Sequence, residues 1–366
     1  MRTLSTGHGE LELPAFLPDA TRGAVRALDS TDSAACGVAA LMVNTVHLAS
    51  RPGSSVISAM GGIHRFIDWA GPIFSDSGGF QVFSLTTGSP QLARVSKDGF
   101  SYRFNRSERK RTLSPETCVR KQFQMGSDVI FCLDHCTHPN SPPDLQRESV
   151  EHTVEWAARS KSELIRLKEN VRREGYDPLL FAVVQGGSSH KLRRTCAERL
   201  LEIGFDGFGF GGWPIDADGG LVDTVEYVSQ LVPAEFPKHA LGIGKPENVV
   251  AAFRSGYRLF DCVIPTRDAR HKRLYVYPDG EPELGTGDGV FYERIYIDAN
   301  RNVKEKRPVD ETCDCLCCTR YSRAYLHHLF NVDDHLAYRL ATIHNVRFYT
   351  RLMEMLRAED RRGQTP

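Results

Sequence analysis

Short apolar runs alternate with helical segments along most of this 366-residue chain, and this alternation limits its fold more than any other feature. The runs typical of buried strands are residues 41–45, 73–74 and those near 130, 182, 208, 241 and 262. The segments with helical periodicity are residues 115–125, 149–174, 190–203 and 246–255. Strand, helix and strand in this order predict parallel βαβ units. So many units in series predict an α/β protein built on a TIM (β/α)8 barrel.

Polar groups stand at the ends of several of these apolar runs. They are Asp76, Asp134, Gln185, Gly211-Gly212 and Asp261. The carboxyl ends of parallel strands meet at one face of a barrel, and a Gly-Gly turn lets a planar ligand approach the backbone. We therefore expect these groups to converge on one pocket.

Two carboxylates in one pocket are the minimum apparatus for displacement at a sugar C1′. Asp261 follows the apolar pair Leu259-Phe260, and this rigid, partly desolvated mount suits a nucleophile. Asp134 precedes a loop and suits the amide edge of a guanine-like base, for which Gln185 supplies a complementary donor. Any one of these acids alone is more typical of a helix cap or a loop carboxylate. The set of acids indicates catalysis.

The charge balance excludes a general attraction to nucleic acid, because 46 Lys and Arg residues face 46 Asp and Glu residues. Any RNA contact must therefore use a local patch. The chain has two basic clusters, residues 266–273 beside Asp261 and residues 102–111 in a β-like segment after Asp76. No apolar run reaches membrane-spanning length and no signal-peptide core follows Met1, so we expect a cytoplasmic protein with no membrane contact.

Four of the ten cysteines crowd into residues 313–318. Cys313, Cys315 and Cys318 have a C-x-C-x-x-C spacing, which supplies three thiolates and leaves one tetrahedral position for an imidazole. The candidates for that position are His327, His328, His335 and His344. A closed thiolate-rich site predicts one structural Zn2+ ion per chain, and the alternative is a cluster of reduced cysteines.

The βα alternation stops after Arg273, and this break sets the expected domain boundaries. Residues 1–273 are predicted to form the main part of the barrel, with an N-terminal β segment. Residues 274–344 are predicted to form a small β-rich, zinc-binding subdomain inserted before the last barrel helix. Residues 345–366 are the expected C-terminal helix that completes the barrel.

Several segments, spread nearly from end to end, match one family in order and spacing. They are residues 44–48, 51–53, 76–82, 113–116, 126–128, 184–187, 242–246, 260–267, the three spaced cysteines, 322–328 and 344–345. Together they resemble the tRNA-guanine transglycosylase family, the queuine tRNA-ribosyltransferases, and most closely its bacterial branch.

The resemblance implies a TIM-type barrel with a zinc subdomain that exchanges the wobble guanine of tRNAs with G-U-N anticodons. The incoming base is a 7-substituted 7-deazaguanine, either the prequeuosine base or queuine, in queuosine biosynthesis or salvage. By position, Asp261 is the nucleophile that forms a covalent ribosyl intermediate, and Asp76 is the general acid/base. The expected partners are the tRNA anticodon loop, the 7-deazaguanine base and a second copy of the chain in a homodimer.

The resemblance also assigns the binding residues by position. The residues expected at the base are Phe80, Asp134, Gln185 and Gly212, and Trp213 is expected beside them although it departs from the family's pattern. The residues expected at the anticodon loop are Arg267 and Arg270. The residues expected to bind zinc are Cys313, Cys315, Cys318 and His344.

The chain departs from the family's pattern beside the base pocket. Trp213 adds bulk and Pro214 removes a backbone donor, and Trp213 either narrows the pocket or turns away onto the barrel rim. Cys136 and the bulky Ile215 resemble the branch that uses the small prequeuosine base.

His135 stands where the family has an acid, and Val46 where it has an aromatic residue. The first change takes away a carboxylate that would pair with an aminomethyl cation, so the incoming base is left open.

Two other functions fit parts of the pattern. A non-catalytic tRNA-binding partner subunit would keep the barrel and the zinc, but it has no physical need for both Asp76 and Asp261. Insertion of a deazaguanine into DNA, or hydrolytic deglycosylation, is disfavoured by the well-matched segment that holds Arg267 and Arg270.

Overall fold

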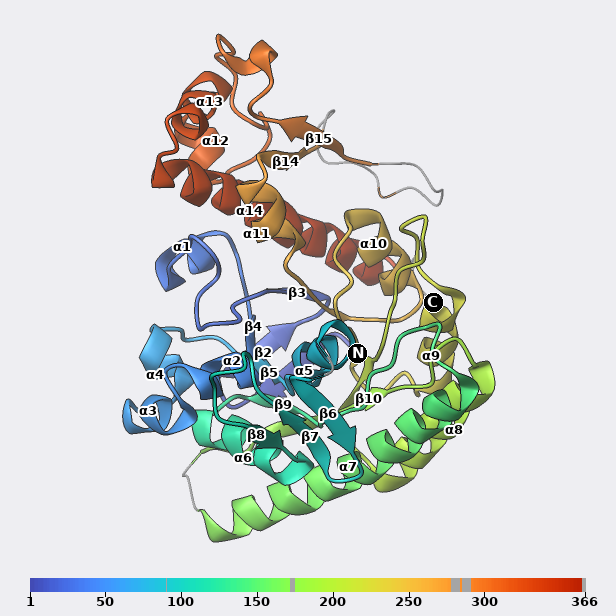
Figure 1. The fold of residues 1–366 in the computed structure, drawn as a ribbon. Coiled ribbons are helices and arrows are strands. Elements are labelled where there is room, and N and C mark those ends of the chain that lie inside the picture. Colours follow the sequence, from blue (N-terminus) through green and yellow to red (C-terminus); the bar gives the residue numbers. More distant parts are fainter. Residues whose placement is uncertain (90, 172–174, 278–283, 285–290, 364–366) are drawn as a thin grey trace.

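The computed structural model describes residues 1–366 except 90, 172–174, 278–283, 285–290 and 364–366. Its centre is one sheet of eight parallel strands, drawn in Figure 1. The strands are β3 (Ala15–Pro18), β4 (Leu41–Asn44), β5 (Ile73–Asp76), β9 (Val129–Phe131), β10 (Leu179–Val184), β11 (Gly207–Phe210), β12 (Lys238–Ala240) and β13 (Leu259–Cys262).

The sheet closes on itself. Its order is β3-β13-β12-β11-β10-β9-β5-β4, and each neighbouring pair is parallel. The two end strands meet through a parallel bridge between Asp19 and Met42, where Ala20 N also donates to Met42 O at 2.7 Å. The predicted TIM (β/α)8 barrel is therefore confirmed.

Helices surround the barrel. Among the described residues, none of the helices is both long enough and apolar enough to cross a membrane. The longer ones are α5 (Gly79–Gly88), α6 (Pro115–Met125), α7 (Pro143–Asn170), α8 (His190–Ile203), α9 (Asp223–Leu231), α10 (Pro246–Arg254) and α14 (His335–Arg361). The shorter ones are α1 (Ser30–Ala35), α2 (Thr45–Ser50), α3 (Ser54–Ala59), α4 (Ile63–Ile67) and α11 (Ile264–Arg270). The predicted helices 115–125 and 190–203 are confirmed at both ends, and the side chains of Ser114 and Ser189 cap their N-termini.

Several elements differ from the prediction. The helix predicted at residues 149–174 begins at Pro143. Strand β3 was absent from the predicted runs, because Pro14 precedes it, Pro18 is its last residue, and proline argues against a central strand. The last helix begins at His335 rather than near Asn345, and the side chain of Asp334 caps its first turn.

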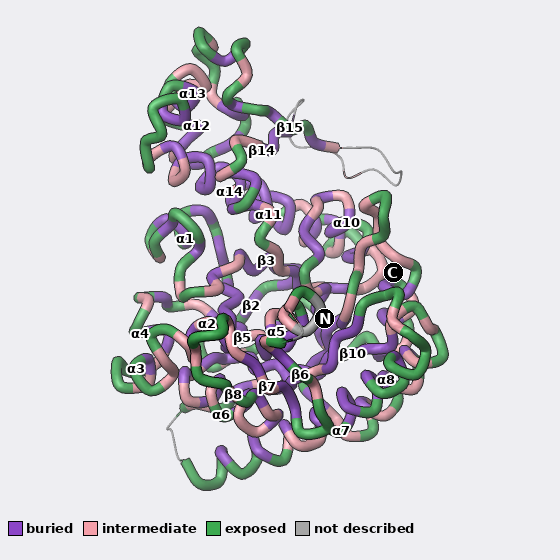
Figure 2. The backbone as a smooth tube through the Cα atoms, in the orientation of Figure 1, coloured by how far each residue is buried: buried purple, intermediate pink, exposed green. Residues whose placement is uncertain are grey.

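The barrel is filled by apolar side chains and is closed at its N-terminal end. Buried residues concentrate along the strands in Figure 2. Phe131 and Phe181 pack at 5.5 Å inside the barrel, in one cluster with Leu11 of the N-terminal hairpin formed by β1 (Thr3–Thr6) and β2 (Gly9–Glu12). The C-terminal ends of the strands are therefore the face left for a ligand.

Two insertions interrupt the βα alternation. An antiparallel sheet of β6 (Ala93–Ser96), β7 (Gly99–Tyr102) and β8 (Arg111–Leu113) lies between α5 and α6. The second insertion, between α11 and α14, contains β14 (Arg273–Val276), β15 (Glu293–Tyr296), the 3-10 turn η1 (Asn300–Asn302), α12 (Leu316–Arg320) and α13 (Arg323–Asn331). Figure 1 shows this second insertion as a separate lobe, and α14 runs from it onto the barrel.

Candidate active site and metal centre

Asp76 is the last residue of β5, and both of its carboxylate oxygens are held. Asn44 Nδ2, at the end of β4, donates to Oδ2 at 2.9 Å, and Gly78 N donates to Oδ1 at 3.0 Å. Gly78 has a φ of +75°, and a Cβ there would lie 2.1 Å from Val46, so this turn requires glycine. Burial raises the pKa of Asp76 to about 7, and the charge of Asp261 adds to the rise. Near neutral pH this group can both give and take a proton.

Asp261 lies in β13 and is held through one oxygen. His239 Nε2, from β12, lies 2.9 Å from Oδ1, and Gly242 N donates to the same oxygen at 3.3 Å. His239 is fully buried against Phe74 and Phe131, and its Nδ1 has no hydrogen-bond partner among the described residues. The ring therefore meets Asp261 through Nε2. Among the described residues, no hydrogen bond is made to Oδ2 of Asp261, which is the oxygen left for a substrate.

The acids Asp76, Asp261 and Asp19 share the C-terminal face of the barrel. Repulsion from Asp261 and from Asp19 contributes, after burial, to the raised pKa of Asp76. Burial also raises the pKa of Asp19, and Asp261 adds to that rise. Asp19 follows β3, so it was overlooked together with that strand.

Asp134 and Gln185 lie together beyond the ends of β9 and β10. Gln185 Nε2 donates to Asp134 Oδ2 at 2.6 Å, and Ser77 Oγ donates to Oδ1 at 3.5 Å. Burial raises the pKa of Asp134 to about 6, against the opposing hydrogen bond from Gln185. The carboxylate is thus mainly ionised at pH 7. An ionised carboxylate beside an amide is complementary to the amide and amino edge of guanine.

Arg193 of α8 orders the glycine loops beside this pair, and sequence reasoning missed it. Its Nε donates to Gly187 O at 2.9 Å, and its Nη1 donates to Val184 O at 2.6 Å and to Gly211 O at 2.8 Å. The guanidinium lies 4.3 Å from the ring centroid of Phe210. Burial lowers the pKa of Arg193 to about 10, so it remains charged. It joins the backbone after β10 to the backbone after β11.

Exposed aromatic rings stand at the same face. Phe80 is 46% exposed and Trp213 is 39% exposed, and their ring centroids are 5.8 Å apart in an edge-to-face contact. His138 lies 5.4 Å from Trp213. Gly212, with a φ of +97°, leads the chain into Trp213. Trp213 is therefore beside Phe80 rather than isolated on the rim.

His135 is buried in an aromatic cluster. Its Nδ1 lies 3.2 Å from His152 Nδ1, and its ring stacks 5.9 Å from that of Trp156. Burial, with the neighbouring His152, lowers the pKa of His135 to about 4. The ring is neutral at pH 7 and supplies no charge to an incoming base.

Arg267 and Arg270 lie on α11, which begins shortly after Asp261. Arg267 is exposed, with its Nε 3.8 Å from Asp268 Oδ1. Arg270 is half-buried and donates from Nη1 to Thr266 O at 2.9 Å. Both cations therefore stand beside the nucleophile candidate.

The predicted ligands Cys313, Cys315, Cys318 and His344 are brought together. Their donor atoms all lie within 4.8 Å of one another, and the four residues are buried. His344 Nδ1 lies 3.2 Å from Cys318 Sγ, and Nε2 donates to Tyr275 O at 2.6 Å. That second contact leaves the Nδ1 lone pair facing the thiols, as in metal-bound histidines. The group fits a tetrahedral metal ion.

A second cluster of potential ligands lies at the other end of the barrel. Asp128 accepts from His8 Nδ1 at 2.6 Å, from His64 Nε2 at 2.9 Å and from Ile73 N at 2.8 Å. These hydrogen bonds satisfy both carboxylate oxygens of Asp128. The cluster therefore has a structural role, because it holds the N-terminal hairpin against the barrel.

A barrel with acids at its C-terminal face and a buried Cys3His group that could hold a metal ion fits the class of glycosyl-transfer enzymes. The family model described as "TGT: Queuine tRNA-ribosyltransferase" matches residues 1–366. The chain belongs to the queuine tRNA-ribosyltransferase family, whose members are tRNA-guanine pentosyltransferases.

Similar proteins from three bacteria carry the name queuine tRNA-ribosyltransferase. The relative from Syntrophobacter fumaroxidans is 38% identical over 355 residues, covering 97% of this chain and 88% of its own. The relative from a Psychrobacter species is 37% identical over 357 residues, with the same coverage. The relative from Solidesulfovibrio magneticus is 35% identical over 362 residues, covering 99% of this chain and 90% of its own.

Proposed function

We propose that the protein exchanges the wobble guanine of tRNAs with G-U-N anticodons for a 7-substituted 7-deazaguanine, through a covalent ribosyl–Asp261 intermediate. The observation that carries the proposal is that Asp76 and Asp261 both stand at the C-terminal ends of barrel strands, with the charge of Asp261 contributing to the raised pKa of Asp76. The hydrogen bonds of the two carboxylates indicate which acid is the nucleophile and which transfers the proton. Asp261 keeps one oxygen free for attack, and Asp76 has a pKa of about 7, which suits proton transfer.

The exchange proceeds in two matched displacements. Oδ2 of Asp261 attacks C1′ of the ribose, the C1′–N9 bond to guanine breaks, and Asp76 gives its proton to the departing base. The incoming base then gives its N9 proton to Asp76, and N9 displaces Asp261 from C1′. One glycosidic bond replaces another, so the reaction needs no energy source.

The base-binding roles follow from position. Asp134 and Gln185 face the amide and amino edge of the base, and the backbone at Gly212 meets another edge. Phe80 and Trp213 cover the ring face. His135 is neutral and supplies no charge that would select an aminomethyl cation. The choice between the prequeuosine base and queuine is therefore decided by the base-exchange assay.

The remaining assignments rest on the resemblance and on the geometry of the groups. Arg267 and Arg270 contact the anticodon loop. We take the metal held by Cys313, Cys315, Cys318 and His344 to be zinc, which cross-links the subdomain and takes no part in bond exchange. The family likeness supports a cytoplasmic homodimer.

The direct test is base exchange on tRNA. A G-U-N tRNA carrying radiolabelled wobble guanine is incubated with the protein and with the prequeuosine base or queuine in turn, and its nucleosides are then analysed. We expect release of labelled guanine and a new deazaguanosine at the wobble position with at least one base. Retention of all label by the folded protein, or exchange in single-stranded DNA alone, would refute the proposed tRNA reaction.

A further inference from the structure

The small sheet β6–β8 has two chemically different faces. Its inner face is apolar, and Ala93, Phe100, Tyr102 and Leu113 are buried in one cluster with Trp156. Side chains alternate across a strand, so the residues between them point outward. The outward residues include Arg94, Ser101, Arg103, Lys110 and Thr112.

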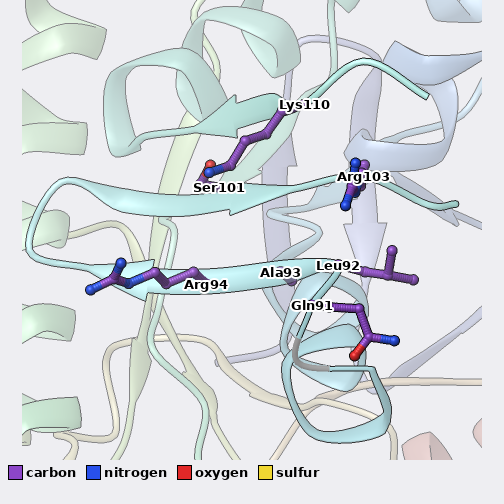
Figure 3. A pocket seen from close by; sticks show the side chains of 7 residues that line it. All are labelled: Gln91, Leu92, Ala93, Arg94, Ser101, Arg103 and Lys110. Carbon is purple, nitrogen blue, oxygen red and sulfur yellow. The ribbon is translucent and has the colours of Figure 1, made fainter. Parts of the chain in front are cut away.

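The outward face is strongly basic in a chain with no net charge. Residues 91–113 contain seven Lys and Arg residues against two acids, a net charge of +5. Arg94, Arg103 and Lys110 line a hollow of about 300 Å³ together with Gln91 and Ser101, as Figure 3 shows.

Within the residues that the structure describes, none of these three cations forms an ion pair. In the described part of the sheet, an ion pair joins Arg111 to Glu108 at 3.9 Å, whereas Arg103 donates to the backbone oxygen of Arg106 at 3.3 Å. An exposed charge run is ordinarily a solvated face that mixes both signs. A hollow with three unneutralised cations and neutral hydrogen-bonding neighbours suits a polyanion.

The sheet lies next to the candidate active site. Helix α5 leaves the Asp76 turn and leads directly into β6, and a ten-residue helix spans about 15 Å. At the end of β7, the ring of Phe104 stacks 6.1 Å from that of His47 in α2, which follows Asn44 at the end of β4. Figure 1 shows α5 between this sheet and α11.

We propose that the hollow on the outer face of β6–β8 binds backbone phosphates of the tRNA anticodon stem. The proposal rests on the proposed function for the identity of the RNA. Residues 91–113 present no exposed large apolar side chain on which a base could stack. A cationic, hydroxyl-bearing face without aromatic rings contacts phosphate rather than bases. With the loop base held beside Asp261, the stem is the next part of the RNA to reach this sheet.

The test compares two triple variants of the full-length protein. One neutralises the hollow (Arg94→Gln, Arg103→Gln, Lys110→Gln). The control removes the same charge from exposed positions on the barrel's outer helices (Arg147→Gln, Lys168→Gln, Lys191→Gln). Dissociation constants are measured against a G-U-N tRNA and against its anticodon loop as a short single strand, over a range of salt concentrations.

We expect the hollow variant to bind tRNA about tenfold or more weakly at physiological salt. The slope of log Kd against log salt should fall by about 2 to 3, because each lost phosphate contact removes about 1. Binding of the single-stranded loop should change no more than in the control. Equal tRNA binding by the two triple variants, or equal weakening for tRNA and loop, would overturn the stem contact. Weakened stem binding in a protein that shows no base exchange would uphold this surface and refute the proposed reaction.

Discussion

Asp76 holds a proton that an aspartate in an unfolded chain would lose. Burial and then the charge of Asp261 raise the pKa of Asp76 to about 7, whereas the unfolded value is about 3.9. The folded state therefore binds the proton more tightly than the unfolded chain. The resulting stabilisation is complete below the unfolded pKa and is lost as the pH rises through the folded pKa. Asn44 and Gly78 offset part of this loss through their hydrogen bonds.

Asp76→Asn should consequently become more stable relative to the parent as the pH rises. We expect the difference in free energy of unfolding to grow by about 2.5 kcal/mol between pH 5 and pH 8, since each pKa unit is worth about 1.4 kcal/mol. Urea unfolding at the two pH values measures it. Asp218→Asn, in an exposed loop, is the matched control and should show no such growth. A constant difference for Asp76→Asn would contradict the raised pKa.

The two acids could be picked out from the sequence because each sits at an apolar strand. Their positioning residues could not. His239 contacts Asp261 from another strand, and a lone histidine in a short run gives no signal of its partner. Arg193 lies in an amphipathic helix, where an arginine ordinarily faces solvent, yet its guanidinium is buried on three carbonyl groups.

At the scale of elements, α14 joins the candidate metal site to the barrel. His344 faces the thiols of the cluster, and the next residue, Asn345, donates to Pro265 O at 3.1 Å and to Arg273 O at 2.9 Å. Farther along, the hydroxyl of Tyr349 donates to Gly244 O at 2.5 Å. Loss of the metal should therefore weaken the packing of the subdomain against the barrel.

His344→Ala should lower metal affinity at least about a hundredfold, because it removes one of four ligands. It should also lower the melting temperature and admit protease cleavage within residues 291–334. Metal content by elemental analysis and limited proteolysis check this prediction. The control is His328→Ala, an exposed imidazole on α13, which should keep about one metal ion per chain. Full metal content in His344→Ala after mild chelation would remove His344 from the site.

At the scale of the whole molecule, one barrel face gathers groups that are far apart in the chain. The alternation of apolar runs and helices predicted this architecture, since buried parallel strands are apolar on both faces. Closure of the barrel was predicted only from the number of βα units, and the strand pairing that closes it was not predicted. It depends on the bridge between Asp19 and Met42, which pairs β4 with a strand that prolines conceal. From the sequence, the basic sheet could be identified only as a run of charged residues. Its separate apolar and basic faces depend on the register of the strands, which the sequence alone does not give.

A covalent bond between Asp261 and ribose C1′ is the step on which the proposed exchange depends. The protein is incubated with a G-U-N tRNA without an incoming base, denatured, and digested for mass spectrometry of RNA-linked peptides. We predict an adduct on the peptide containing Asp261, and its complete loss in Asp261→Asn with the fold retained. An adduct that persists in Asp261→Asn, or that maps to the peptide containing Asp76, would contradict the assignment of the nucleophile.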